Sequence, residues 1–157
     1  MPSAEYRVSP ADESIRLGPL SIRFLATGAE THGTLALFEL IVPAAARLAA
    51  PPHSHDQYDE TIYGLEGVLT WTVDDVPIEV RAGDALVIPR GAVHRFDNHG
   101  EVAATAVCVV TPAAIGPGFF RESAEVLNAA GGGPPDGARL AAIMAHHGPK
   151  PVPPPQG

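Results

Sequence analysis

The stretch that decides the fold runs from His53 to Asn98 and reads HSHDQYDETIYGLEGVLTWTVDDVPIEVRAGDALVIPRGAVHRFDN. Short runs of β-forming residues alternate in it with turns that contain glycine or proline, which is typical of closely spaced strands. Four of its side chains are good metal ligands, namely His53, His55, Glu60 and His94. Residues two apart on an extended strand point to the same face, so the rings of His53 and His55 can reach one ion. We therefore predict a metal site whose ligands come from separate strands.

The spacing of these residues resembles the two signature motifs of the cupin superfamily. The motifs read here as His53-x-His55-x4-Glu60-x6-Gly67 and Gly83-x5-Pro89-x-Gly91-x2-His94-x3-Asn98. One position departs from the family pattern, because Arg47 stands where a glycine usually precedes the first histidine by six residues. That glycine shapes a turn and binds nothing, so the departure concerns loop geometry and leaves the ligands intact. The resemblance covers about residues 20–111 and implies an all-β jelly-roll barrel of the small single-barrel type, similar to quercetinase-like cupin dioxygenases.

The flanking sequence extends the strand pattern to about eight short strands, with turn residues at about every 8 to 12 positions. We predict an N-terminal arm at residues 1–19, the barrel at 20–112, a helical segment at 113–148 and a proline-rich tail at 149–157. Asp74 and Asp75 separate two strand-like runs and predict a tight hairpin turn. Only one set of ligands is present, which indicates one barrel and no internal duplication.

Composition sets the outer limits of function. The chain has 157 residues, enough for one domain with a sizeable core, and its formal net charge of −8 argues against a nucleic-acid surface. The single Cys108 cannot form an internal disulfide, so nothing demands an oxidising compartment. No secretory signal and no apolar run of roughly 20 residues is evident. We expect a cytoplasmic protein without a membrane partner, and the family resemblance implies a homodimer.

Three imidazoles and one carboxylate leave one or two coordination positions of an ion open, which is the mark of a catalytic site. Divalent Mn, Fe, Co, Ni or Zn would each accept these ligands, and the sequence does not choose between them. Such an ion can polarise a bound oxygen atom and, if redox-active, bring dioxygen to the substrate. The resemblance to flavonol-opening dioxygenases implies that Glu60 is the catalytic residue, accepting a proton from the substrate.

Strand alternation places Ile62 on the inward face with Glu60, and Phe96 on the inward face with His94. Four side chains are predicted to line a substrate pocket: Tyr58, Ile62, Trp71 and Phe96. Trp71 could instead fill the core. We expect a metal-dependent enzyme that acts on a small aromatic or enolisable molecule, with oxidoreductase chemistry of the dioxygenase type as the leading hypothesis. A non-oxidative lyase or isomerase remains open, as does a ligand-binding or sensor cupin without turnover.

The remaining histidines are predicted to lie outside the site. His32 and His99 stand beside glycines in expected turns. His146 and His147 are adjacent on an expected helix and point about 100° apart, so they cannot both face one ion. Phe119 and Phe120 are expected to anchor the C-terminal helices against the barrel.

Overall fold

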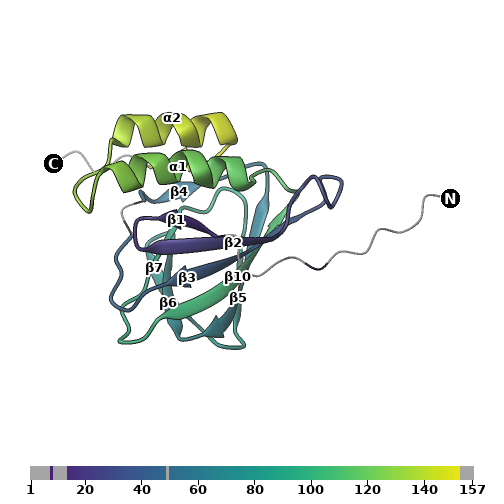
Figure 1. Ribbon diagram of the computed structural model, residues 1–157. Coiled ribbons are helices and arrows are strands. Elements are labelled where there is room, and N and C mark those ends of the chain that lie inside the picture. The colour runs from purple at the N-terminus through teal and green to yellow at the C-terminus, as the bar shows by residue number, and fades with distance from the viewer. Residues whose placement is uncertain (1–7, 9–13, 49, 153–157) are drawn as a thin grey trace.

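The computed structural model describes residues 8, 14–48 and 50–152, and it forms two facing β-sheets with two helices at one end (Figure 1). The strands are β1 (Ile15–Leu17), β2 (Leu20–Ala26), β3 (Ala36–Val42), β4 (His53–Ser54), β5 (Asp59–Glu66), β6 (Val68–Val73), β7 (Val76–Arg81), β8 (Ala85–Ile88), β9 (His94–Asp97), β10 (Ala104–Thr111) and β11 (Lys150–Pro151). The helices are α1 (Pro117–Ala129) and α2 (Gly137–His147). The predicted all-β jelly-roll class with a helical C-terminal segment is therefore confirmed.

One sheet has the strand order β1-β2-β3-β10-β5-β8 and the other the order β11-β4-β9-β6-β7. All strand pairs are antiparallel, and sequence-distant strands such as β3 and β10 lie side by side at the centre of the larger sheet. Because successive side chains of a strand alternate between faces, every second residue of these two strands is buried. The inward residues of both sheets form one core, and this core surrounds the site described below.

The β6–β7 hairpin confirms the tight turn predicted from two adjacent acidic residues. Val73 pairs with Val76, and the two residues between them, Asp74 and Asp75, have φ angles of 46° and 66°. Two positive φ angles in a two-residue loop match the right-handed twist of the flanking strands. The turn is thus built without the glycine that usually relieves this conformation.

The two helices pack against one another and over one end of the barrel (Figure 1). Phe120 of α1 anchors this packing, with its ring centroid 5.1 Å from that of Phe38 and 5.7 Å from that of Phe24. The α2 helix begins after Asp136, whose carboxylate accepts a hydrogen bond from the Arg139 backbone, and ends at Gly148 in the left-handed conformation. None of the helices in the described part of the chain is both long and apolar enough to cross a bilayer.

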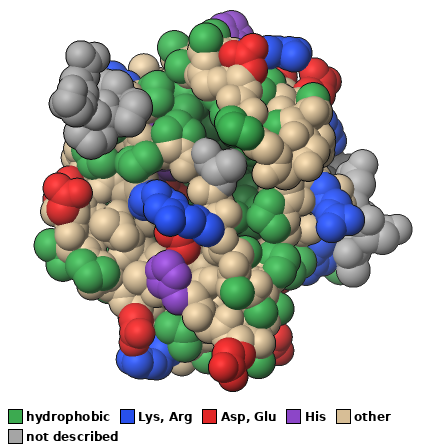
Figure 2. Space-filling view, turned by 90° about the vertical axis from the view of Figure 1, so that its left-hand side faces the viewer, with side chains coloured by type: hydrophobic (Ala, Val, Ile, Leu, Met, Phe, Trp, Pro, Cys, Tyr) green, Lys and Arg blue, Asp and Glu red, His purple; other side chains and the backbone are tan. Residues whose placement is uncertain are grey.

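Two short strands lie where the sequence indicated none. The β1 strand occupies residues assigned to the arm and pairs with β2, and β11 occupies residues assigned to the tail and pairs with β4. A strand of two or three residues is too short to show the alternation of apolar and polar residues that identifies a strand in a sequence. Such a strand forms because it pairs with a neighbouring strand. Residues 1–7 and 9–13 of the predicted arm and residues 153–157 of the tail lie outside the described residues. On the face in Figure 2, acidic and basic side chains lie interspersed, so its charge is mixed.

Candidate metal centre

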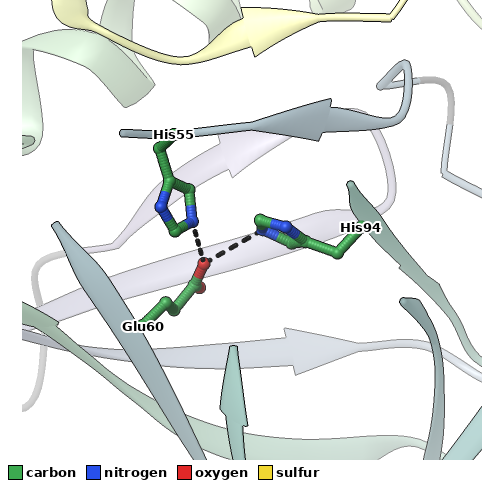
Figure 3. A group of neighbouring side chains, drawn as sticks. All are labelled: His55, Glu60 and His94. Atoms are coloured by element: carbon green, nitrogen blue, oxygen red, sulfur yellow. Dashed lines mark hydrogen bonds and ion pairs between the residues drawn. The ribbon is translucent and has the colours of Figure 1, made fainter. Parts of the chain in front are cut away.

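Three of the four predicted ligands converge inside the barrel. Glu60 lies on β5 of the larger sheet, His94 opens β9 of the smaller one, and His55 follows the end of β4. The three side chains point toward one another (Figure 3), and their ligand atoms lie within 4.8 Å of one another. One carboxylate oxygen of Glu60 is 3.3 Å from Nε2 of His55 and 3.2 Å from Nε2 of His94. All three side chains are buried.

His53, the fourth predicted ligand, lies beside this group. It pairs directly with His94 across β4 and β9, and the two ring centroids are 4.5 Å apart. Its ring centroid is 6.4 Å from that of His55, and it is not among the three residues whose ligand atoms all lie within 4.8 Å of one another. The structure thus brings His55, Glu60 and His94 into mutual reach and places His53 at the rim of the same cluster.

A backbone carbonyl orients each of the three imidazoles. Nδ1 of His55 lies 2.8 Å from the carbonyl oxygen of Tyr58, and Nδ1 of His94 lies 3.0 Å from that of Ala92. Nδ1 of His53 lies 3.3 Å from the carbonyl oxygen of Pro51. A carbonyl oxygen can only accept a hydrogen bond, so we assign the proton of each neutral ring to Nδ1. In this tautomer Nε2 of the neutral ring carries a lone pair, whereas a protonated Nε2 of His55 or His94 donates a hydrogen bond to Glu60.

The electrostatics of the cluster favour an ionised carboxylate. Burial would raise the pKa of Glu60, but hydrogen bonds from His55 and His94 outweigh it and lower the pKa to about 2. Burial would lower the pKa of His94, yet its contact with Glu60 dominates and raises that pKa. Burial lowers the pKa of His53 to about 4, assisted by the neighbouring His94. Glu60 is therefore anionic and His53 neutral at pH 7.

The donor set fits a divalent transition metal. Two Nε2 lone pairs aimed at one carboxylate oxygen repel it unless a proton or a cation lies between them. Two ligand atoms bound at right angles to an ion, each at ~2.1 Å, lie ~3 Å apart. The observed separations of 3.2 and 3.3 Å are close to that value. Imidazole nitrogen and carboxylate oxygen suit Mn, Fe, Co, Ni and Zn alike, so the cluster could bind one such ion without determining which.

A largely apolar cavity of about 120 Å³ adjoins the cluster. Three of the residues predicted for a substrate pocket, Tyr58, Trp71 and Phe96, line this cavity, and Trp71 is both part of the core and part of this wall. The Tyr58 ring stacks on His55 at 3.9 Å, and Trp71 contacts Phe96 at 4.5 Å between ring centroids. These contacts fix aromatic surfaces next to the histidines.

Ile62 corrects the predicted pocket. It points inward as strand alternation requires and is fully buried, but it packs in the core and is not among the cavity-lining residues. Alternation determines the face of a strand on which a residue lies, and it does not determine depth along the barrel. The helical wall of the cavity was missed by sequence reasoning, although the buried face of each helix is the signal that could have revealed it.

The other histidines and the cysteine lie outside the cluster. His32 and His99 lie in turns or loops, and His146 and His147 end α2, where Nε2 of His147 is 3.2 Å from a carboxylate oxygen of Glu122. Cys108 is fully buried on β10, as expected of a small core residue. Burial, together with the nearby charge of Glu60, raises the pKa of its thiol well above the usual value.

Comparison with known proteins agrees with this architecture. Residues 40–110 match the family model described as "Cupin domain". The chain is 32% identical over 91 residues to the uncharacterized protein MJ1618 of Methanocaldococcus jannaschii, which covers 58% of this chain and 67% of that protein. It is 33% identical over 101 residues to quercetin 2,3-dioxygenase of Bacillus subtilis, covering 63% of this chain. The match spans only 28% of the dioxygenase, which is a much longer protein.

A solved structure has a similar fold. The polyketide cyclase RemF from Streptomyces resistomycificus superposes with a TM-score of 0.59 at 26% identity, covering 69% of this chain and 80% of that one. The two sheets, the family match over the motif-bearing strands and the converging histidines and glutamate lead to one conclusion. The chain belongs to the cupin superfamily.

Proposed function

We propose that this cupin is a metal-dependent enzyme that acts on a small, largely apolar molecule with an aromatic or enolisable group. His53, His55, Glu60 and His94 would hold the ion. The observation that carries the proposal is the orientation of the three imidazoles, each with Nδ1 at a backbone carbonyl, and with Nε2 of His55 and of His94 directed at Glu60. Second contacts of this kind are typical of metal-binding histidines, because they fix both the tautomer and the ring.

A bound divalent ion would polarise an oxygen atom of the substrate and, if redox-active, could also bring dioxygen to it. Glu60 is ionised at neutral pH and faces the cavity, so its carboxylate can accept the proton that the substrate loses. Tyr58, Trp71 and Phe96 would orient an apolar ring beside it. The apolar walls would limit the access of water to the reacting atoms.

Dioxygenase chemistry is the leading proposal, supported by the similarity to quercetin 2,3-dioxygenase over 63% of this chain. A non-oxidative reaction is the second candidate, supported by the similarity to a protein described as a polyketide cyclase. Oxygen consumption separates the two. The oxidative reaction consumes dioxygen and requires a redox-active metal, whereas the non-oxidative one proceeds equally with zinc under anaerobic conditions.

The metal itself is tested by elemental analysis of protein purified without added metal. We expect about one equivalent of a transition metal in the wild type and its loss in His94→Ala, because this change removes a central ligand. His99→Ala is the matched control, since His99 lies in a loop outside the cluster. Wild-type metal content in His94→Ala, or equal loss in both variants, would contradict the proposal.

A further inference from the structure

We propose that the substrate of this site is limited to a single-ring molecule, because α1 and α2 form one wall of the narrow cavity above the His–Glu cluster. This inference rests on the proposed function and names the size class of its substrate. It would separate this chain from catalysts for flavonols and other molecules with three or more fused or linked rings.

The volume of the cavity sets the limit. It measures about 120 Å³ and extends from His53, Glu60 and His94 to the inner face of the helices. An apolar cavity of ~150 Å³ holds one benzene molecule, whereas sites for drug-sized ligands measure roughly 300–1,000 Å³. The space here accordingly matches one ring with a small substituent. A three-ring compound would require the wall to move.

The wall that sets this limit is helical. Six of the cavity-lining residues come from α1 and α2: Phe119, Phe120, Ser123, Leu127, Leu140 and Met144. The barrel supplies the opposite side, with Glu60 and Trp71 among its residues. A ligand in contact with the cluster would thus lie between the barrel and the helix pair.

The helix pair is fixed to the barrel at two separate places. At the end of α1, the Asn128 side chain accepts a hydrogen bond from the Gly18 backbone at 2.8 Å and donates one to the Arg16 carbonyl at 2.8 Å. After α2, β11 pairs with β4 next to His53, and Lys150 forms an ion pair with Asp56. The connection between α2 and β11 includes Pro149, which is buried and lines the cavity. These two attachments hold the helix pair against the barrel, so a ligand meets the cavity at the volume given above.

The wall also lies outside the part of the chain that the family shares. The match to the cupin family model ends at residue 110, and α1 begins at Pro117. The size limit is therefore a property of this chain's C-terminal segment and does not follow from membership of the family.

Titration calorimetry on the purified full chain tests the limit with a series of hydroxyl compounds: phenol, 1-naphthol and 3-hydroxyflavone. Larger apolar compounds ordinarily bind more tightly because they bury more surface. We expect the reverse order here, with phenol bound, 1-naphthol at least about tenfold weaker and 3-hydroxyflavone unbound. The inference is overturned if 3-hydroxyflavone binds as tightly as phenol, or if no compound binds.

Paired variants test the role of the helices. Met144→Ala enlarges the cavity from α2, so the affinity for 1-naphthol relative to phenol should rise at least about tenfold. Val126→Ala is the matched control, because Val126 is buried on α1 but does not line the cavity. An equal gain in both variants, or none in Met144→Ala, overturns the inference.

The two proposals fail separately. The titrations are repeated on metal-free protein, and metal content is measured independently. If phenol binds more tightly than the larger compounds but the protein takes up no metal, only the proposed function is refuted. If the protein takes up metal but affinity does not fall with ligand size, only this inference is refuted.

Discussion

At the residue scale, the cluster is held by contacts that do not depend on a metal. Three carbonyl oxygens orient the imidazoles of His53, His55 and His94, and two of these rings contact Glu60. The motif spacing predicted the ligand types and their strands, because spacing along a strand fixes the face on which a side chain lies. It could not predict that His53 would lie at the rim. That position depends on how β4 pairs with β9.

The shifted pKa values predict an optimum in the pH dependence of stability for the metal-free protein. The pKa of Glu60 is about 2 in the folded state and 4.5 in the unfolded chain, and that of His53 is about 4 in the folded state and 6.5 in the unfolded chain. Between the two values of each group, the unfolded chain binds more protons than the folded protein. Stability therefore rises with pH from about 2 to about 6.5. The pKa of His94 is raised above 6.5, so the folded state binds more protons there and stability falls as pH rises through that pKa.

Thermal unfolding of chelator-treated protein between about pH 4 and 9 measures this dependence. The contribution of the cluster to the free energy of unfolding should be greatest near pH 6.5. At that pH, Glu60 and His53 are deprotonated in both the folded and the unfolded state, and His94 is still protonated in the folded state. Glu60→Gln should flatten the profile, since the charge that raises the pKa of His94 is removed. His99→Ala should keep the wild-type profile. A profile that Glu60→Gln leaves unchanged would refute the electrostatic assignment.

Cys108 provides a second residue-scale prediction. Its thiol is fully buried, and burial together with Glu60 raises its pKa, so very little reactive thiolate exists at neutral pH. We expect the native protein to resist a thiol-specific reagent for hours and the urea-unfolded protein to react within minutes. Mass spectrometry counts the labelled fraction. Rapid labelling of the folded protein would show that β10 is more open than the structure indicates.

At the scale of elements, long periodic strands were predictable and short ones were not. The alternation of β3 and β10 is visible in the sequence because each buries every second residue. The strands β1 and β11 have three and two residues and exist only through their partners. The inward direction of Ile62 followed from its strand, whereas its depth depended on the packing of the opposite sheet.

The β6–β7 turn carries a prediction of its own. Asp75 is exposed and has a φ of 66°, a conformation that glycine adopts at lower cost. We expect Asp75→Gly to raise the free energy of unfolding by about 0.5 kcal/mol, measured as a higher urea midpoint. Asp74→Gly is the control, because Asp74 also accepts a hydrogen bond from the Val93 backbone at 2.9 Å, and its loss should offset the gain. A lower midpoint for Asp75→Gly would contradict the turn geometry.

At the scale of the whole molecule, the cluster joins the two sheets. Glu60 comes from the larger sheet, and His94 belongs to the smaller one, which also contains His53. These ligands are distant in sequence and meet only when the barrel is closed. An ion held by them would bind the folded state far better than the unfolded chain, so metal binding and global stability would be coupled.

Metal removal should therefore destabilise the entire barrel and not only its interior. A metal at ~100 times its dissociation constant adds about 2.7 kcal/mol to the free energy of unfolding, which corresponds to roughly 5–10 °C in Tm for a chain of this size. We expect a chelator to lower the Tm of the wild type by that amount and to leave the Tm of His94→Ala unchanged. Added zinc or manganese should restore the wild-type value. Equal chelator sensitivity in the variant would mean that the ion binds elsewhere, and insensitivity of the metal-loaded wild type would mean that the ion does not bridge the sheets.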